Sequence, residues 1–182
     1  MKRKLSFLLL CVLTVLVVGC NTEATSETYH DPMKAPSLLP ENPIGLVNGE
    51  VSQEYFDELT IFYSRMTVYT TSEYLFRTEP QVDEDILNDD EYFANYALLL
   101  DKAEEIMSDF SIKPFSPAEK EISIVSEDYK EATRNTSEML RRFFQTRDLT
   151  TIRGNLDLIE IEAEKEKLFY ETLQKYKLTT SK

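Results

Sequence analysis

Apolar side chains recur at alternating steps of three and four residues over four stretches of the chain, which is the spacing of an amphipathic α-helix. The four apolar rows, in chain order, are Tyr55, Leu59, Phe62, Met66, Tyr69 and Phe76; Tyr92, Tyr96, Leu99, Ala103, Ile106 and Phe110; Ile122, Val125, Tyr129, Ala132, Thr136, Met139 and Phe143; and Ile152, Leu156, Ile159, Ala163, Tyr170 and Leu173. The third row is unbroken, whereas Glu166 interrupts the fourth.

The residues that flank the first two rows set the expected ends of their helices. Ser52 is a good N-cap for the first helix, which is expected to end near Thr78, before Pro80. The second helix is expected to follow the acidic loop 83–91, which caps it, and to close before Pro114.

The third helix has the clearest start in the chain. Ser116-Pro117-Ala118-Glu119 forms a capping box with proline at the first helical position. The fourth helix is expected to begin between Asp148 and Thr151, with a first turn weakened by Gly154.

Four amphipathic helices with short connections predict an all-α fold, an up-down-up-down four-helix bundle. The same pattern is compatible with a dimer of helical hairpins. The prolines between the helices exclude one long coiled coil, because the heptads cannot continue through them.

The first 20 residues, MKRKLSFLLLCVLTVLVVGC, carry a different pattern. Three basic residues precede about 14 mostly apolar ones, which is short for a membrane span and typical of a signal peptide. The run ends in Val17-Val18-Gly19-Cys20, which resembles the lipobox of bacterial prolipoproteins. The resemblance implies transfer of diacylglycerol to the Cys20 thiol, cleavage after Gly19 and acylation of the new amine.

The cysteine count agrees with this interpretation. Cys11 lies inside the leader, so cleavage leaves Cys20 as the one cysteine and no disulfide can form within the chain. Two or three acyl chains anchor a protein stably where one does not.

Residues 20–50 are expected to be the lipidated cysteine and a flexible tether, of which 21–43 are rich in proline and small polar residues. The bundle is then expected over residues 51–178. The segment around Asn48-Gly49 resembles the start of the N-terminal domain of SurA-type chaperones and parvulin-type foldases, which implies a short strand before the first helix. The match covers about ten residues and departs from that pattern, since Glu50 alone separates Gly49 from Val51.

The net charge of the chain limits the classes of partner that it is expected to bind. The chain has 20 Lys and Arg against 33 Asp and Glu, and removal of Lys2, Arg3 and Lys4 with the leader leaves a formal net charge of −16. So acidic a protein is expected to bind no nucleic acid and to gain nothing from charge on an anionic lipid surface.

The sequence contains few of the residues and motifs that enzymes use for catalysis. The single histidine, His30, lies in the expected tether, which leaves no Ser-His-Asp or Cys-His pair and no Glu-x-x-His di-iron motif. The acidic loop departs from the residue order of a calcium-binding EF-hand. Leu87 stands at a ligand position, and Asn88 stands at the position of the glycine. We therefore expect no catalytic residues, no metal and no cofactor, and a solvated position for most glutamates.

Tyr55, Phe62, Tyr69 and Phe76 repeat every seven residues, and between Thr60 and Ser72 only Arg65 is charged. Stretch 60–72 is thus expected to be either the most buried part of the bundle or a surface that a partner covers. The four aromatic residues are candidates for that partner surface, and burial is the favoured alternative.

Together these patterns predict a lipid-anchored, extracytoplasmic lipoprotein that acts by binding an unknown envelope protein. Its layout resembles that of small helical surface lipoproteins of Gram-positive bacteria. A chaperone-like or substrate-binding lipoprotein is the alternative. Asn21 is not the aspartate that retains lipoproteins at a Gram-negative inner membrane, so a Gram-negative source would imply the outer membrane.

Overall fold

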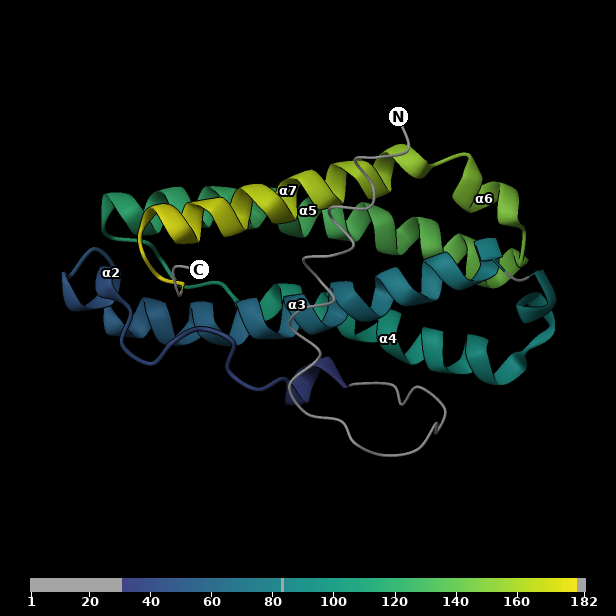
Figure 1. Ribbon diagram of the computed structural model, residues 1–182, viewed down its shortest axis with the longest axis horizontal. Helices are drawn as coiled ribbons and strands as arrows, with labels where there is room; N and C mark the ends of the chain where they lie inside the picture. Colours follow the sequence, from purple (N-terminus) through teal and green to yellow (C-terminus); the bar gives the residue numbers. More distant parts are fainter. Residues whose placement is uncertain (1–30, 83, 180–182) are drawn as a thin grey trace.

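The computed structural model describes residues 31–82 and 84–179, without the side chains of 75–82, 84 and 85. The predictions on the leader, on Gly19 and on Cys20 lie outside the described residues. Within them the structure is all-α, as predicted. Its long helices are α3 (Gln53–Val82), α4 (Asp90–Asp109), α5 (Pro117–Thr146) and α7 (Leu156–Lys175), and they form a bundle within one chain (Figure 1).

Ion pairs between neighbouring helices show the antiparallel order. On α5 and α7, Glu121 pairs with Lys175 at 2.6 Å and Asp128 with Lys165 at 2.7 Å. On α4 and α5, Glu104 and Asp101 pair with Arg134 and Arg141, each at 3.0 Å. In both pairs of helices the sequence numbers run in opposite directions, which is the up-and-down arrangement expected.

The predicted helix starts are confirmed by their caps. Ser52 accepts a hydrogen bond from the amide of Tyr55, and Asp89, from the acidic loop, accepts one from the amide of Tyr92. At α5 the Ser116 side chain accepts from the amide of Glu119, whose carboxylate accepts in turn from the amide of Ser116. Each cap satisfies amides that the first turn of a helix leaves without a partner.

Helix α3 does not stop near Thr78 but continues through Pro80 to Val82. That prediction was wrong because Pro80 falls in the last turn of the helix. A missing N–H there removes one hydrogen bond at the end of the ladder, where the following carbonyls have no helical partner in any case. A short 3-10 helix, η2 (Glu84–Asn88), then leads to α4.

The expected fourth helix is divided into α6 (Leu149–Arg153) and α7. Asp148 caps α6 through the amide of Thr150 at 2.9 Å, and the Asn155 side chain donates to the carbonyl of Thr151 at 2.7 Å. After the break the apolar row is displaced: Leu156 is 46% exposed, whereas Phe169, absent from the expected row, is 1% exposed.

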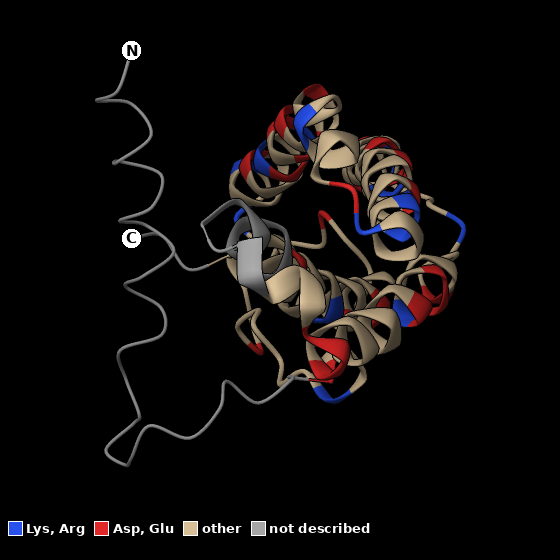
Figure 2. Cartoon of the chain, turned by 90° about the vertical axis from the view of Figure 1, so that its right-hand side faces the viewer, with Lys and Arg blue, Asp and Glu red and all other residues tan. Residues whose placement is uncertain are grey.

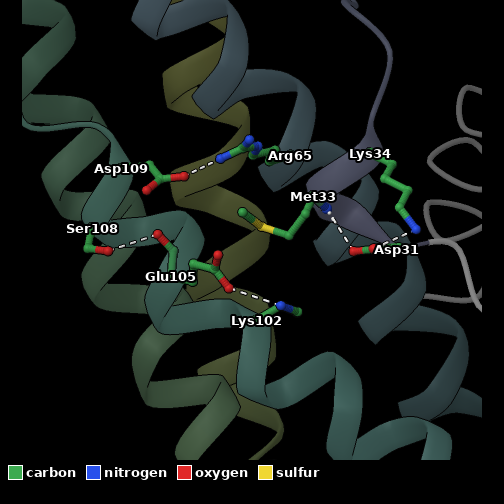
Figure 3. A network of polar contacts seen from close by, with 8 residues as sticks. All are labelled: Asp31, Met33, Lys34, Arg65, Lys102, Glu105, Ser108 and Asp109. Atoms are coloured by element: carbon green, nitrogen blue, oxygen red, sulfur yellow. Dashed lines mark hydrogen bonds and ion pairs between the residues drawn. The ribbon is translucent and has the colours of Figure 1, made fainter.

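Residues 31–50, which we call the strap, pack on the bundle instead of continuing the tether. The strap contains η1 (Pro32–Lys34) and α2 (Ile44–Val47). The amide of Leu38 donates to Ser64 of α3 at 3.0 Å, and the Leu39 side chain is buried. Figure 3 shows the Met33 side chain pointing from η1 toward α4, beside the ion pair of Arg65 and Asp109.

The strap corrects two expectations. The flexible spacer was expected to reach residue 43. Apolar residues between its prolines instead pack against the bundle, so residues 31–43 are part of the fold. The strand implied before Asn48-Gly49 is absent, because Ile44–Val47 form a helical turn that ends at Gly49 with φ +72°. The SurA-type resemblance therefore has no structural counterpart in this segment.

No helix in the described part of the chain combines the length and the apolar character needed to cross a bilayer.

Candidate functional site

Three of the four aromatic residues proposed as a partner surface lie in the core. Tyr55, Phe62 and Tyr69 are each no more than 1% exposed, and the Phe76 side chain is outside the described residues. The favoured alternative, burial of this stretch, is confirmed for Phe62, Met66 and Tyr69. The prediction of a partner surface is therefore wrong for Tyr55, Phe62 and Tyr69. Their contacts inside the bundle decide their role.

All three face α5 at the same offset. Tyr55 lies 2.8 Å from Ser123, the Lys130 ammonium lies 5.3 Å from the Phe62 ring centre, and Tyr69 lies 2.6 Å from Ser137. Each pair is separated by 68 residues. A constant offset means that α3 and α5 run parallel and in register across the bundle, so the interior is divided into layers.

The first layer joins three segments through Glu119. Its carboxylate accepts hydrogen bonds from the amides of Ser52 at 2.8 Å, Phe115 at 2.7 Å and Ser116 at 2.9 Å. Burial acts to raise the pKa of Glu119, but these donors outweigh it and hold the pKa below its usual value. The Tyr55 hydroxyl donates to the Glu119 carbonyl at 3.0 Å, and burial raises the pKa of Tyr55 to about 12.

The second layer holds a buried ammonium. Lys130 is 5% exposed, and its Nζ donates to the Phe110 carbonyl at 2.5 Å and to Glu127 at 2.8 Å. The same atom lies 5.3 Å from the ring centres of both Phe62 and Phe110. A carbonyl, a carboxylate and two aromatic rings thus surround the ammonium, which takes part in the packing of the core.

The third layer brings tyrosines and carboxylates together. The Tyr69 hydroxyl donates to Glu73 at 3.0 Å and lies against Ser137, and the hydroxyl of Tyr129 donates to Thr70 at 3.3 Å. Glu73 and Glu162 are 0% and 2% exposed.

Burial, as the largest cause, raises the pKa of Tyr69 and of Tyr129 well above the usual value. Negative charge on Glu73 and Glu162 adds to the shift of both phenols. Both phenols therefore stay protonated at neutral pH, where they donate hydrogen bonds and cannot serve as bases.

These layers offer little room for a ligand. A pocket of about 140 Å³ lies between the strap and α3, lined in part by Met33, Ile61 and Ser64. Clefts that hold small ligands measure roughly 300–1,000 Å³. Among the residues that the structure describes, no three His, Cys, Asp or Glu side chains are placed to share a metal ion. The absence of an enzyme activity stays a prediction.

The acidic loop is engaged in the fold where it is described. Asp89 caps α4, and Asp90 pairs with Arg147 at 2.6 Å. The Arg147 guanidinium also lies 4.3 Å from the ring centre of Phe93 and donates to the Leu87 carbonyl. These contacts fix the turn between α3 and α4 against the end of α5.

The sequence pattern did not reveal the buried carboxylates. Ile159, Glu162, Glu166, Phe169 and Leu173 follow one another at steps of three and four, so they form a regular row that includes two acids. Considered for apolar residues alone, this row is interrupted, whereas the neighbouring row through Leu156, Ala163 and Tyr170 is more regular. Acids at core positions were the signal that could have located the third layer.

Most of the other glutamates are solvated, as expected, and the polar groups of the interior stabilise the bundle. Comparison with known proteins assigns no relative, because no family model, no curated protein and no solved structure matches the chain.

Proposed function

We propose that this protein is a lipid-anchored, extracytoplasmic binding module of the bacterial cell envelope. The observation that carries the proposal is Val17-Val18-Gly19-Cys20, placed after a basic start and a short apolar run. Lipidation at Cys20 also accounts for a single cysteine in the mature chain. The acyl chains attach the bundle to the membrane, on the outer membrane if the source is Gram-negative.

The packing of the bundle favours a macromolecular partner over a small ligand. Inside the bundle Tyr69 donates to Glu73 and Lys130 donates to the Phe110 carbonyl, and the pocket beside the strap is small. Binding then takes place on the outer faces of the helices. With a formal charge of −16 after cleavage, these faces suit an envelope protein that presents basic groups.

Mass spectrometry of the mature N-terminal peptide tests the anchor. We expect a peptide that begins at Cys20 and carries diacylglycerol on the thiol, with or without an acyl group on the amine. A peptide that begins elsewhere, or an unmodified Cys20, would contradict the proposal.

Chemical cross-linking in the native envelope, followed by capture of the protein, tests the binding role. We expect a discrete cross-linked partner whose yield falls as salt is raised, since salt screens the charges of an acidic surface. Recovery of the protein alone, at every salt concentration, would show an anchored protein that binds no envelope protein.

A further inference from the structure

The two most exposed large apolar side chains of the described residues, Phe115 and Val47, lie at one end of the bundle, where α2 and the starts of α3 and α5 meet the end of α7. Phe115 is 75% exposed, Val47 72% and Ile44 55%. We call this the basal end, and it lies at the left of Figure 1. Single exposed apolar residues are common, but three on neighbouring turns form a protruding apolar surface.

Backbone contacts hold these turns together. The Ser116 hydroxyl donates to the Glu50 carbonyl at 2.6 Å, which joins the residues next to Phe115 to the strap. The amide of Gly45 donates to the Lys177 carbonyl at 3.3 Å, which fixes α2 against the end of α7. A Cβ atom on Gly45 would lie 2.0 Å from the Tyr176 carbonyl oxygen, so this approach requires glycine. The exposed side chains are thus presented by a rigid frame.

The opposite end, which we call the acidic end, carries exposed acids together with exposed Arg142 and Arg153. Asp89, Asp90 and Glu91 are exposed at the start of α4, and Asp148 is exposed beyond α5. Figure 2 looks onto this end and shows acidic ribbon at the turn into α4. At the basal end, exposed Lys113, Lys120 and Lys177 balance the acidic residues nearby.

We propose that the basal end rests in the head-group region of the bilayer that carries the Cys20 lipid, with Val47 and Phe115 inserted. This inference rests on the proposed lipid anchor. Aromatic and aliphatic side chains that protrude beside lysines are typical of surfaces that enter the boundary between head groups and acyl chains. The acidic end then faces away from the membrane, toward partners.

The length of chain outside the structure fits this orientation. From Cys20 to Asp31 there are eleven residue steps, which span at most about 40 Å. The strap is held by Ser64, eleven residues into α3, which places η1 roughly 17 Å along the helix from the basal end. The tether therefore reaches the bilayer with the basal end in contact.

Lipid photolabelling of the full, acylated protein tests the orientation. The protein is reconstituted in vesicles of phosphatidylethanolamine and phosphatidylglycerol that contain a lipid with a photoactivatable group near its head. We expect adducts in peptides with residues 44–50 and 113–120, and few in 86–91 or 148–155. The double variant Val47→Ser, Phe115→Ser should lose about tenfold in adduct yield, because apolar area has been removed. Leu98→Ser, at an exposed residue in the middle of α4, is the matched control and should label as the native protein does.

Several results would overturn the inference. These are equal labelling of both ends, preference for the acidic end, or unchanged labelling of the double variant with an unchanged melting temperature. Cross-links between Val47 or Phe115 of two copies, without lipid adducts, would assign the basal end to a dimer instead. The N-terminal peptide of the same sample separates the two proposals. An acylated Cys20 without lipid adducts at the basal end would contradict the proposed orientation alone. An unacylated Cys20 would contradict both the proposed anchor and the proposed orientation.

Discussion

The hydroxyl of Tyr69 on α3 lies 2.6 Å from that of Ser137 on α5, and two heptads earlier Tyr55 and Ser123 lie 2.8 Å apart. Both partners advance by 14 residues, so the two helices keep the same phase over four turns. Phe62 and Lys130 occupy the heptad between them. The heptad row of aromatic residues therefore sets the register between α3 and α5. This role explains why residues that look like a partner surface in the sequence are buried.

Replacement of Tyr69 by phenylalanine tests this register. The change removes the hydroxyl that contacts Ser137 and Glu73 and leaves both buried partners with one hydrogen bond fewer. We expect the free energy of unfolding to fall by about 1–3 kcal/mol, measured by urea denaturation. Phe115→Ala, at an exposed residue, should change it by less than about 0.5 kcal/mol. Equal stability of native protein and Tyr69→Phe would show that the hydroxyl contributes nothing.

Phe62 and Ile61 are sequence neighbours with opposite environments. Phe62 is 1% exposed and stacks on Phe110 at 5.0 Å, whereas Ile61 is 49% exposed. Phe62→Ala should destabilise the bundle by roughly 3–5 kcal/mol, because it opens a cavity beside two aromatic partners, Phe110 and Phe169. Ile61→Ala should cost far less. If Phe62→Ala melted normally and lost its envelope partner, this stretch would be a binding face after all.

Ala132 lies in the close contact of α5 with α7, between the contacts Asp128 to Lys165 and Thr136 to Leu158. Ala132→Glu adds a further carboxylate to a core that already holds Glu73 and Glu162. We expect unfolding or a melting temperature too low to measure, since a buried charge without a partner costs several kcal/mol of roughly 5–15 available. Asn135→Glu introduces the same side chain at an exposed position of the same helix and should melt as the native protein does.

Glu119 makes the stability depend on pH in a defined direction. Its pKa is lowered in the folded state, so its contribution is complete above the unfolded value of about 4.3 and is lost as pH falls through the folded pKa. Glu119→Gln should lower the free energy of unfolding by about 1.5–3 kcal/mol at neutral pH. The variant should also lack the part of the stability loss at low pH that comes from protonation of Glu119. Urea unfolding from pH 7 down to pH 3 measures both effects. Glu131→Gln, at an exposed residue, should leave the native profile unchanged, and a Glu119→Gln profile parallel to the native one would contradict the assignment.

Local sequence rules predicted the helix starts and most of the core. The capping box at Ser116 and the unbroken row from Ile122 to Phe143 depend on short-range geometry, and the structure follows both. The break at Gly154-Asn155 depends on Asp148, which caps the short α6, and on the Asn155 side chain, which donates to the Thr151 carbonyl. A continuous apolar row conceals both contacts.

The strap and the buried acids could not be predicted in the same way. Leu39 is buried because α3 offers it a surface, and this contact joins residues far apart in sequence. Glu73 and Glu162 are buried among hydroxyl groups from other helices, so their environment exists only after the bundle has formed.

The central claim is that Cys20 carries the lipid that places this bundle at the membrane. Metabolic labelling with radioactive palmitate, followed by membrane fractionation, tests it in the native protein and in Cys20→Ser. We expect the native protein to be labelled and found in the membrane fraction. The Cys20→Ser protein should be unlabelled, as a soluble form or an uncleaved precursor, since cleavage leaves no other cysteine. Label retained on Cys20→Ser, or a native protein without label, would contradict the account.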